Sequence, residues 1–240
     1  MPPTGIERLA AAFWDRVGGR PAPPRDLEAV IWQLGTVWIW SGHPITPDAI
    51  RARFRRRGIA LPKSAFPDCA LHGMIVAHRG SAEIAVDDQL APDLRRMIVA
   101  HEFGHYLAEY LAPRERVLRR LGSSILPVLD GDRPATQIET WAGALAGVKL
   151  GFHSHVLERG FIPDSDKSHE RSEQTANDLA FELLAPWREV LADAPTHAEA
   201  ISVKLVQVYG IPPTWTRGYA RRLAECQERR RSPSARWGFQ

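Results

Sequence analysis

Two histidines and a glutamate in the segment HEFGH, residues 101–105, have the spacing of a metal-binding motif. Residues four positions apart on an α-helix lie one above the other, so His101 and His105 can both direct an imidazole at one Zn²⁺. Glu102 lies beside this pair and could accept the proton of a water molecule that zinc activates. A random chain of this composition would contain about 0.02 such motifs. The segment therefore predicts a hydrolytic zinc site.

A catalytic zinc site also needs a third protein ligand and an open position for water. The extended motif with a third histidine would require glycine at 108 and histidine at 111, where this chain has Ala108 and Leu111. Our candidate is Glu173, which starts the apolar stripe of a helix predicted over residues 172–186. An inward carboxylate there is costly unless it binds something. Asn177 lies on the same stripe.

Three histidines in the intervening segment, His153, His155 and His169, remain alternative ligands. Residues 151–171 carry no clear hydrophobic period, and we expect this segment to be irregular. Each of the three would then be a surface histidine unless the fold brings it to zinc or substrate. The residues alone leave this choice open.

The elements that must position these residues follow from periodicity and turn residues. Residues 92–111 predict the helix that carries the motif, because apolar residues and both motif histidines share one stripe. Two β-type runs, residues 73–78 and 82–87, are separated by a short turn and predict a hairpin. We expect the hairpin to form one wall of the site, with its edge free to pair with an extended substrate. The predicted fold class is α+β, mostly α.

A pair of helices with helix-turn-helix character is predicted over residues 202–225, with the turn at residues 209–211. The second helix carries Arg217, Arg221 and Arg222 and leads into a basic tail. One interpretation is DNA or repressor contact through these C-terminal basic helices. The other is that the pair simply packs on the rest of the protein, since one helical pair is a weak signal.

Two segments together resemble the ImmA/IrrE family of zinc metallopeptidases. The first is DDQLAPDLRRMIVAHEFGHYLAEY, residues 87–110, which is similar to the family's R-R-F-T-x-A-H-E-x-G-H helix. The second is the pattern E-x-x-x-N-x-x-A-x-x-L-L-A-P over residues 173–186, which is similar to the family's second motif helix. The resemblance extends from about Gly73 to Pro186.

This resemblance implies a zincin-like metallopeptidase core with a thermolysin-like, or gluzincin-like, site. His101, His105 and Glu173 would hold Zn²⁺, or Mn²⁺ in its place, and Glu102 would be the catalytic base. Asn177 matches the family's asparagine and would position a ligand or the second helix. The resemblance also implies a protein substrate, a transcriptional repressor of the Xre helix-turn-helix type, cut once to relieve repression.

The interval between the two motif helices departs from the family pattern. The interval from His105 to Glu173 is 68 residues, which is long for the family, so we expect an insertion over residues 113–172 that covers or gates the cleft. The expected organisation is a helical N-terminal region (1–72), a metallopeptidase core (73–190), and a C-terminal helical pair with its basic tail (191–240).

Composition limits the possible classes. The chain is 44% hydrophobic and 25% charged, as in ordinary globular proteins. Its longest mostly apolar stretch, residues 29–40, is shorter than the roughly 18 residues that a membrane span needs. The N-terminus lacks the apolar core of a signal peptide, and two cysteines, Cys69 and Cys226, cannot build a disulfide framework. We therefore expect a cytoplasmic protein with no membrane partner.

Charge supports a rival interpretation. The net charge is +3, and arginines cluster, most densely in RARFRRR at residues 51–57. Such runs are usually solvated helix faces, but they can also contact nucleic acid. The chain could thus be a non-catalytic DNA- or protein-binding regulator, or a toxin–antitoxin component, that keeps a zinc-binding fold. The intact Glu102 favours the enzyme, because a purely structural zinc site needs no base.

Overall fold

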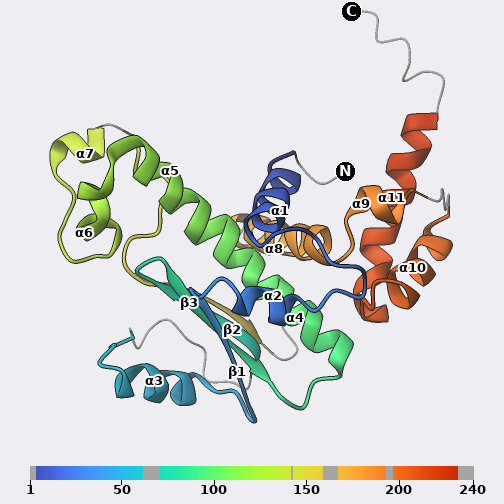
Figure 1. Cartoon of the computed structure of the whole chain (residues 1–240), viewed down its shortest axis with the longest axis horizontal. Coiled ribbons are helices and arrows are strands. Elements are labelled where there is room, and N and C mark those ends of the chain that lie inside the picture. The colour runs from blue at the N-terminus through green and yellow to red at the C-terminus, as the bar shows by residue number, and fades with distance from the viewer. Residues whose placement is uncertain (1–3, 62–70, 142, 159–166, 193–196, 232–240) are drawn as a thin grey trace, which may run out of the picture.

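A computed structural model describes residues 4–61, 71–141, 143–158, 167–192 and 197–231 (Figure 1). The helices are α1 (Thr4–Arg16), α2 (Leu27–Trp32), α3 (Pro47–Arg56), α4 (Pro92–His105), the π-helix η2 (Tyr106–Leu111), α5 (Ala112–Leu121), the 3-10 helix η3 (Ser123–Ile125), α6 (Leu126–Leu129), α7 (Gln137–Trp141), α8 (Lys167–Leu184), α9 (Trp187–Val190), α10 (Ala198–Gln207) and α11 (Pro213–Arg231). The strands are β1 (Val37–Gly42), β2 (Leu71–His78), β3 (Ser81–Asp87) and β4 (His153–Glu158). The expected fold class, α+β and mostly α, is confirmed at this level.

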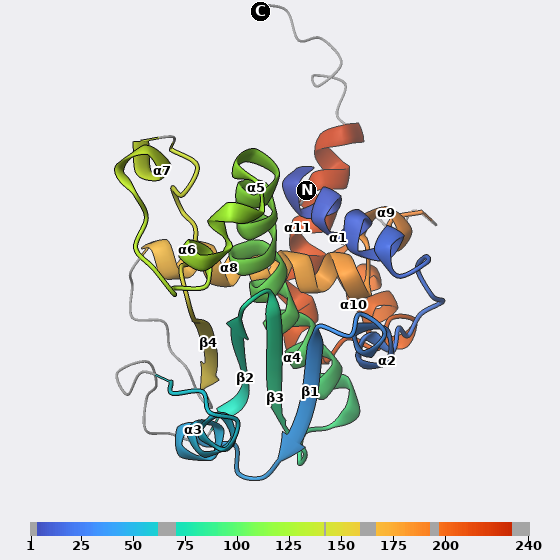
Figure 2. The same cartoon turned by 60° about the vertical axis from the view of Figure 1, so that its left-hand side comes forward.

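The four described strands form one sheet in the order β1-β3-β2-β4 (Figure 2). β2 and β3 pair antiparallel and form the predicted hairpin. β1 pairs parallel with β3, and β4 pairs antiparallel with β2. Strands from three distant parts of the chain therefore meet in one sheet.

The sequence-based expectation of a free hairpin edge is wrong. Both hairpin strands lie inside the sheet, because β1 covers the outer side of β3 and β4 covers the outer side of β2. Among the described strands, the edges are β1 and β4. A substrate that pairs with the sheet beside the motif would therefore meet β4.

The expectation that residues 151–171 are irregular is also wrong where the structure describes them. Residues 153–158 form β4, and α8 already begins at residue 167. Pairing with β2 places His155 opposite Ile75. A short edge strand that contains two histidines, a serine and a glutamate has no apolar alternation, which explains why its sequence does not predict a strand.

Helices cover both faces of the sheet and create two separate apolar clusters. Helix α4 packs on one face, where Ile75 and Ile84 join a core with Ile98, and α8 and then α1 pack behind it. On the opposite face, α3 contributes Ile50 and Phe54 to a smaller cluster with Met74, Val76 and Ala85. Figure 1 shows α3 on the side of the sheet away from α4.

The C-terminal helical pair packs against the helices that carry the two motifs. Phe181 of α8 stacks on Tyr219 of α11 with ring centroids 4.0 Å apart. Asp178 accepts a hydrogen bond from Arg222 Nη2 at 2.6 Å, and Arg96 donates to the carbonyl of Gly210 at 2.9 Å. The predicted pair is therefore anchored on α4 and α8. No helix in the described ranges has the length and apolarity to cross a membrane.

Candidate metal centre

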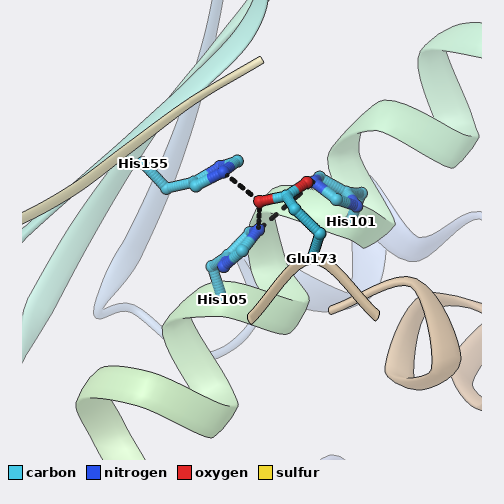
Figure 3. Close-up of side chains that lie close together, drawn as sticks. All are labelled: His101, His105, His155 and Glu173. Carbon is cyan, nitrogen blue, oxygen red and sulfur yellow. Dashed lines mark hydrogen bonds and ion pairs between the residues drawn. The ribbon is translucent and has the colours of Figure 1, made fainter. Parts of the chain in front are cut away.

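The HEFGH segment lies inside α4, at its C-terminal end, as its spacing predicts. His101, Glu102 and His105 are all buried. His101 Nε2 and His105 Nε2 lie 3.2 Å apart, so both rings direct the same nitrogen at one point (Figure 3). The helix thus brings the two histidines together in the manner that metal binding requires.

Gly104 determines how closely α8 approaches this helix. A Cβ at position 104 would lie 2.8 Å from the carbonyl oxygen of Ala176, closer than real Cβ contacts allow. Gly73 acts similarly on the sheet side, where a Cβ would lie 2.5 Å from Ile98 Cγ2. With glycine at both positions, α4 fits between β2 and α8. This close packing carries Glu173 to the two histidines.

The donor atoms of His101, His105 and Glu173 have the spacing of a tetrahedral zinc site. Glu173 Oε2 lies 3.5 Å from His101 Nε2, and Glu173 Oε1 lies 3.5 Å from His105 Nε2. Ligand atoms at about 2.0–2.1 Å from one tetrahedral zinc would lie about 3.3–3.4 Å apart. The three predicted ligands therefore converge on one point at distances that suit zinc, and Figure 3 shows Glu173 between the imidazoles.

Each motif histidine has an acceptor for its other ring nitrogen. His101 Nδ1 lies 2.9 Å from Asn177 Oδ1, and His105 Nδ1 lies 2.9 Å from Glu109 Oε1. An Nδ1–H that donates to these oxygens leaves Nε2 free to bind a metal. Asn177 thus lies where a residue that orients a ligand should be.

Glu109, in η2, is a site residue that the sequence analysis missed. It also accepts a hydrogen bond from the Ser172 hydroxyl, and His153 Nε2 lies 3.4 Å from its Oε2. Burial opposes its ionisation, but the hydrogen bond with His105 lowers the pKa of Glu109 to about 2. Its position, four residues after His105 on the same helical face, was the available signal.

His155 reaches the site from β4 and touches both functional carboxylates. Its Nδ1 lies 3.2 Å from Glu102 Oε2 and its Nε2 lies 2.7 Å from Glu173 Oε1. Its ring stacks on that of His105 with centroids 3.5 Å apart and planes 18° apart. An ion bound through Nε2 must lie near the plane of each imidazole. Two stacked rings cannot both meet this condition, so His105 and His155 cannot bind one ion together in this arrangement.

The other two alternative histidines are placed differently. His153 lies beside Glu109, outside the group formed by His101, His105, His155 and Glu173, whose ligand atoms lie within 4.8 Å of one another. His169 belongs to the first turn of α8, but its side chain lies outside the described part of the structure.

The pKa shifts show that the carboxylates of the site attract positive charge. Burial, with the charge of His105, lowers the pKa of His101 to about 4. Burial opposes ionisation of Glu173, but hydrogen bonds from His105 and His155 outweigh it and hold its pKa far below the usual range. Burial likewise opposes protonation of His155, yet the carboxylates of Glu102 and Glu173 raise its pKa to about 10. The carboxylates thus attract one positive charge, which an imidazolium or a metal ion supplies.

The C-terminal helical pair also borders the site. The indole of Trp215, in α11, lies edge-on to the His101 ring, with centroids 6.0 Å apart and planes 64° apart. Trp215 is partly buried against the main core. The pair is therefore part of the wall around the cluster.

No protein-family model matches this chain, and no curated protein matches it in sequence. The resemblance to ImmA/IrrE peptidases accordingly rests on the two motif segments, and membership of that family remains a prediction.

The donor set itself fits Zn²⁺. Two imidazoles and one carboxylate are ligands that zinc accepts in catalytic sites, and Mn²⁺ also accepts carboxylate oxygens. Glu102 Oε1 is buried, and among the described residues it has no hydrogen-bond partner. A buried, unpartnered carboxylate oxygen beside the ligands can accept a proton from a water molecule or substrate. An acceptor of this kind is what a general base needs.

Proposed function

We propose that this protein is a zinc-dependent endopeptidase of the ImmA/IrrE type. His101, His105 and Glu173 hold the metal, which Mn²⁺ can replace. A bound zinc ion supplies Lewis-acid polarisation of the scissile carbonyl. The observation that carries the proposal is the convergence of three donors at zinc spacing beside the unpartnered Oε1 of Glu102.

Glu102 is the base in this proposal. Its Oε1 accepts the proton of the attacking water, while its Oε2 is held by Nδ1 of His155 at 3.2 Å. Because the side chain is buried and fixed at one oxygen, the other oxygen keeps one orientation. His155 therefore acts as a positioning residue for the base.

The substrate lies along β4. No described strand pairs with the outer side of this edge strand, so an extended peptide can add to it by backbone hydrogen bonds. His155 belongs to β4, and a peptide paired there passes the metal ligands. Trp215 borders His101 and supplies an apolar wall. The edge of β4 thus replaces the hairpin edge that the sequence suggested.

The substrate that the resemblance implies is an Xre-type repressor, and cleavage would then take place in the cytoplasm. Backbone pairing along β4 carries little sequence information. Specificity must therefore come from docking outside the cleft, and the C-terminal pair, which borders the site, is one place for it.

A second candidate function is a non-catalytic regulator with a structural metal site. The observation that favours it is the fourth donor: His155 lies with His101, His105 and Glu173 within 4.8 Å. Four protein ligands are typical of closed, structural zinc sites. Against it stand the stacked rings of His105 and His155, which do not converge on one ion, and the buried Glu102, which a structural site does not use.

The test combines one variant with one substrate. The zinc-loaded protein is incubated with the helix-turn-helix repressor encoded by a neighbouring gene, and cleavage is followed by intact mass. We expect one cut by the parent and a loss of rate of about 10²–10⁴ in Glu102→Gln, the usual contribution of a general base. The variant should keep one zinc per chain, because Glu102 is not among the donors.

Each failure has its own meaning. An intact repressor together with efficient cleavage of casein would leave only a general peptidase. A metal-loaded parent that cuts neither, and a Glu102→Gln variant that behaves like it, would favour the regulator.

A further inference from the structure

The arginine run of the sequence lies on the sheet face away from the metal centre. Helix α3 carries it, and it packs on the smaller apolar cluster while α4 packs on the other face (Figure 1). The run therefore neighbours β1, the edge strand opposite β4. None of the proposed peptidase chemistry uses this surface.

Two indoles of β1 lie under guanidinium groups of this run. Arg53 lies over the Trp40 ring, 4.9 Å from its centroid, and Arg57 lies 6.0 Å from the centroid of Trp38. Both arginines also pair with Glu83, whose carboxylate is buried, and Arg53 Nε donates to it at 2.8 Å. One buried carboxylate thus holds the two guanidinium groups in place beside the tryptophans.

The surface keeps a positive charge after these pairs are formed. Residues 51–57 contain five arginines, and among the described residues Asp48 and Glu83 pair with three of them, Arg51, Arg53 and Arg57. Arg55 and Arg56 are exposed and form no ion pair with any part of the chain that the structure describes. Trp38 and three of the arginines, Arg53, Arg56 and Arg57, line a surface cavity of about 250 Å³.

We propose that this surface, formed by α3 and β1, binds single-stranded nucleic acid. A base enters the cavity against the half-buried indole of Trp38, and the phosphates on either side contact Arg55 and Arg56. Indoles and arginines that alternate along a groove are the usual means of holding a flexible strand without reading its sequence.

The chemistry selects this ligand over two others. In a duplex the bases are stacked inside the helix and cannot reach Trp38, so only the arginines would contribute. An acidic peptide would pair with the arginines but has no use for an indole beside them. Dependence of binding on Trp38 therefore identifies an unpaired base.

The experiment measures binding of fluorescein-labelled dT12 and rU12 by anisotropy at several salt concentrations, with the full chain. We expect Trp38→Ala to weaken binding about tenfold, since one stacked base is lost. We expect the double variant Arg55→Ala, Arg56→Ala to weaken it and to reduce the salt slope by about 1.4, the value for two phosphate contacts on a single strand.

A matched control separates binding at this surface from binding at the arginines of α11. Arg217→Ala with Arg221→Ala removes two exposed arginines from α11 and should leave binding unchanged. Arg55 and Arg56 are exposed, so their replacement does not threaten folding, and zinc uptake of each variant checks the rest of the molecule. Unlabelled AMP and UMP, added as competitors, should displace dT12 only at millimolar concentration, and displacement at micromolar concentration would overturn the proposal of a strand-binding surface.

Several results would overturn the proposal. One is that neither oligonucleotide binds at low salt, and another is that binding survives both Trp38→Ala and the Arg55/Arg56 variant. A third is that the α11 variant loses binding instead. The last is that a duplex binds as well as dT12 and that Trp38→Ala does not change its affinity.

Discussion

Glu173 lies in the N-terminal half of helix α8 and Glu182 in its last turn, and their surroundings differ completely. Glu173 faces three imidazoles, and 17% of its side chain is exposed. Glu182 is 4% exposed, and its carboxylate accepts a hydrogen bond from the backbone N–H of Trp187 at 3.3 Å. The same helix therefore places one carboxylate in a polar cluster and another carboxylate in an apolar core.

Their pKa values move in opposite directions for this reason. Burial disfavours the ionised form of both side chains. At Glu173, hydrogen bonds from His105 and His155 outweigh burial and lower the pKa. At Glu182, burial dominates, the nearby Glu7 adds repulsion, and the pKa rises to about 7. Burial alone thus does not make a metal ligand; the histidines opposite the carboxylate do.

The largest expected effect is the loss of zinc affinity when Glu173, the metal ligand of this pair, is removed. The parent should bind one Zn²⁺ per chain, and Glu173→Ala should lower zinc affinity by more than the about 10–100-fold typical of outer-shell changes. Glu182→Gln, on the same helix, should leave it unchanged. Competition with a chromophoric chelator at pH 7 measures both.

Retention of parental zinc affinity by Glu173→Ala would contradict the assignment. The third ligand would then be one of His153, His155 and His169, and His155→Ala should be measured next, because His155 is already beside the other donors.

The second prediction concerns stability at the other end of α8. The pKa of Glu182 is raised from 4.5 to about 7 in the folded state. Between these two pH values, the folded protein therefore keeps a proton on Glu182 that the unfolded chain has released. Its contribution to stability is complete below about pH 4.5 and is lost as the pH rises to 7. Glu182→Gln stays neutral and should be more stable than the parent at pH 8 by up to about 3 kcal/mol.

At pH 4.5 the two proteins should have nearly equal free energies of unfolding, measured by urea denaturation of the metal-free forms. A stability difference that does not depend on pH would mean that the pKa of Glu182 is the same in the folded and unfolded states.

Local patterns in the sequence predict the parts of the site that lie within one helix. The spacing of HEFGH places His101 and His105, and the apolar stripe of the second helix places Glu173 and Asn177 on the side that faces them. Both are consequences of the 3.6-residue period. The hairpin is likewise a local feature, with two apolar runs and a short turn.

The missed parts depend on contacts between distant segments. β4 has polar residues and becomes a strand only because β2 offers it an edge, and this pairing delivers His155 to Glu102. β1 lies in an apolar stretch that begins as helix α2, so periodicity could not separate the two elements. The tight packing at Gly104 is equally invisible in sequence, because it depends on which helix crosses there.

The smallest expected effect on zinc affinity concerns Asn177 of α8, which contacts His101. Asn177 Oδ1 accepts from His101 Nδ1 at 2.9 Å, which fixes the ring with Nε2 toward the metal point. Asn177→Ala should therefore lower zinc affinity about tenfold, and Asn177→Asp should restore it, because an acceptor returns at the same place. Asp178→Asn is the matched control, since Asp178 pairs with Arg222 instead. Its zinc affinity should equal that of the parent. Equal losses in Asn177→Ala and Asp178→Asn would mean that both changes loosen the helix, and that Asn177 does not orient His101.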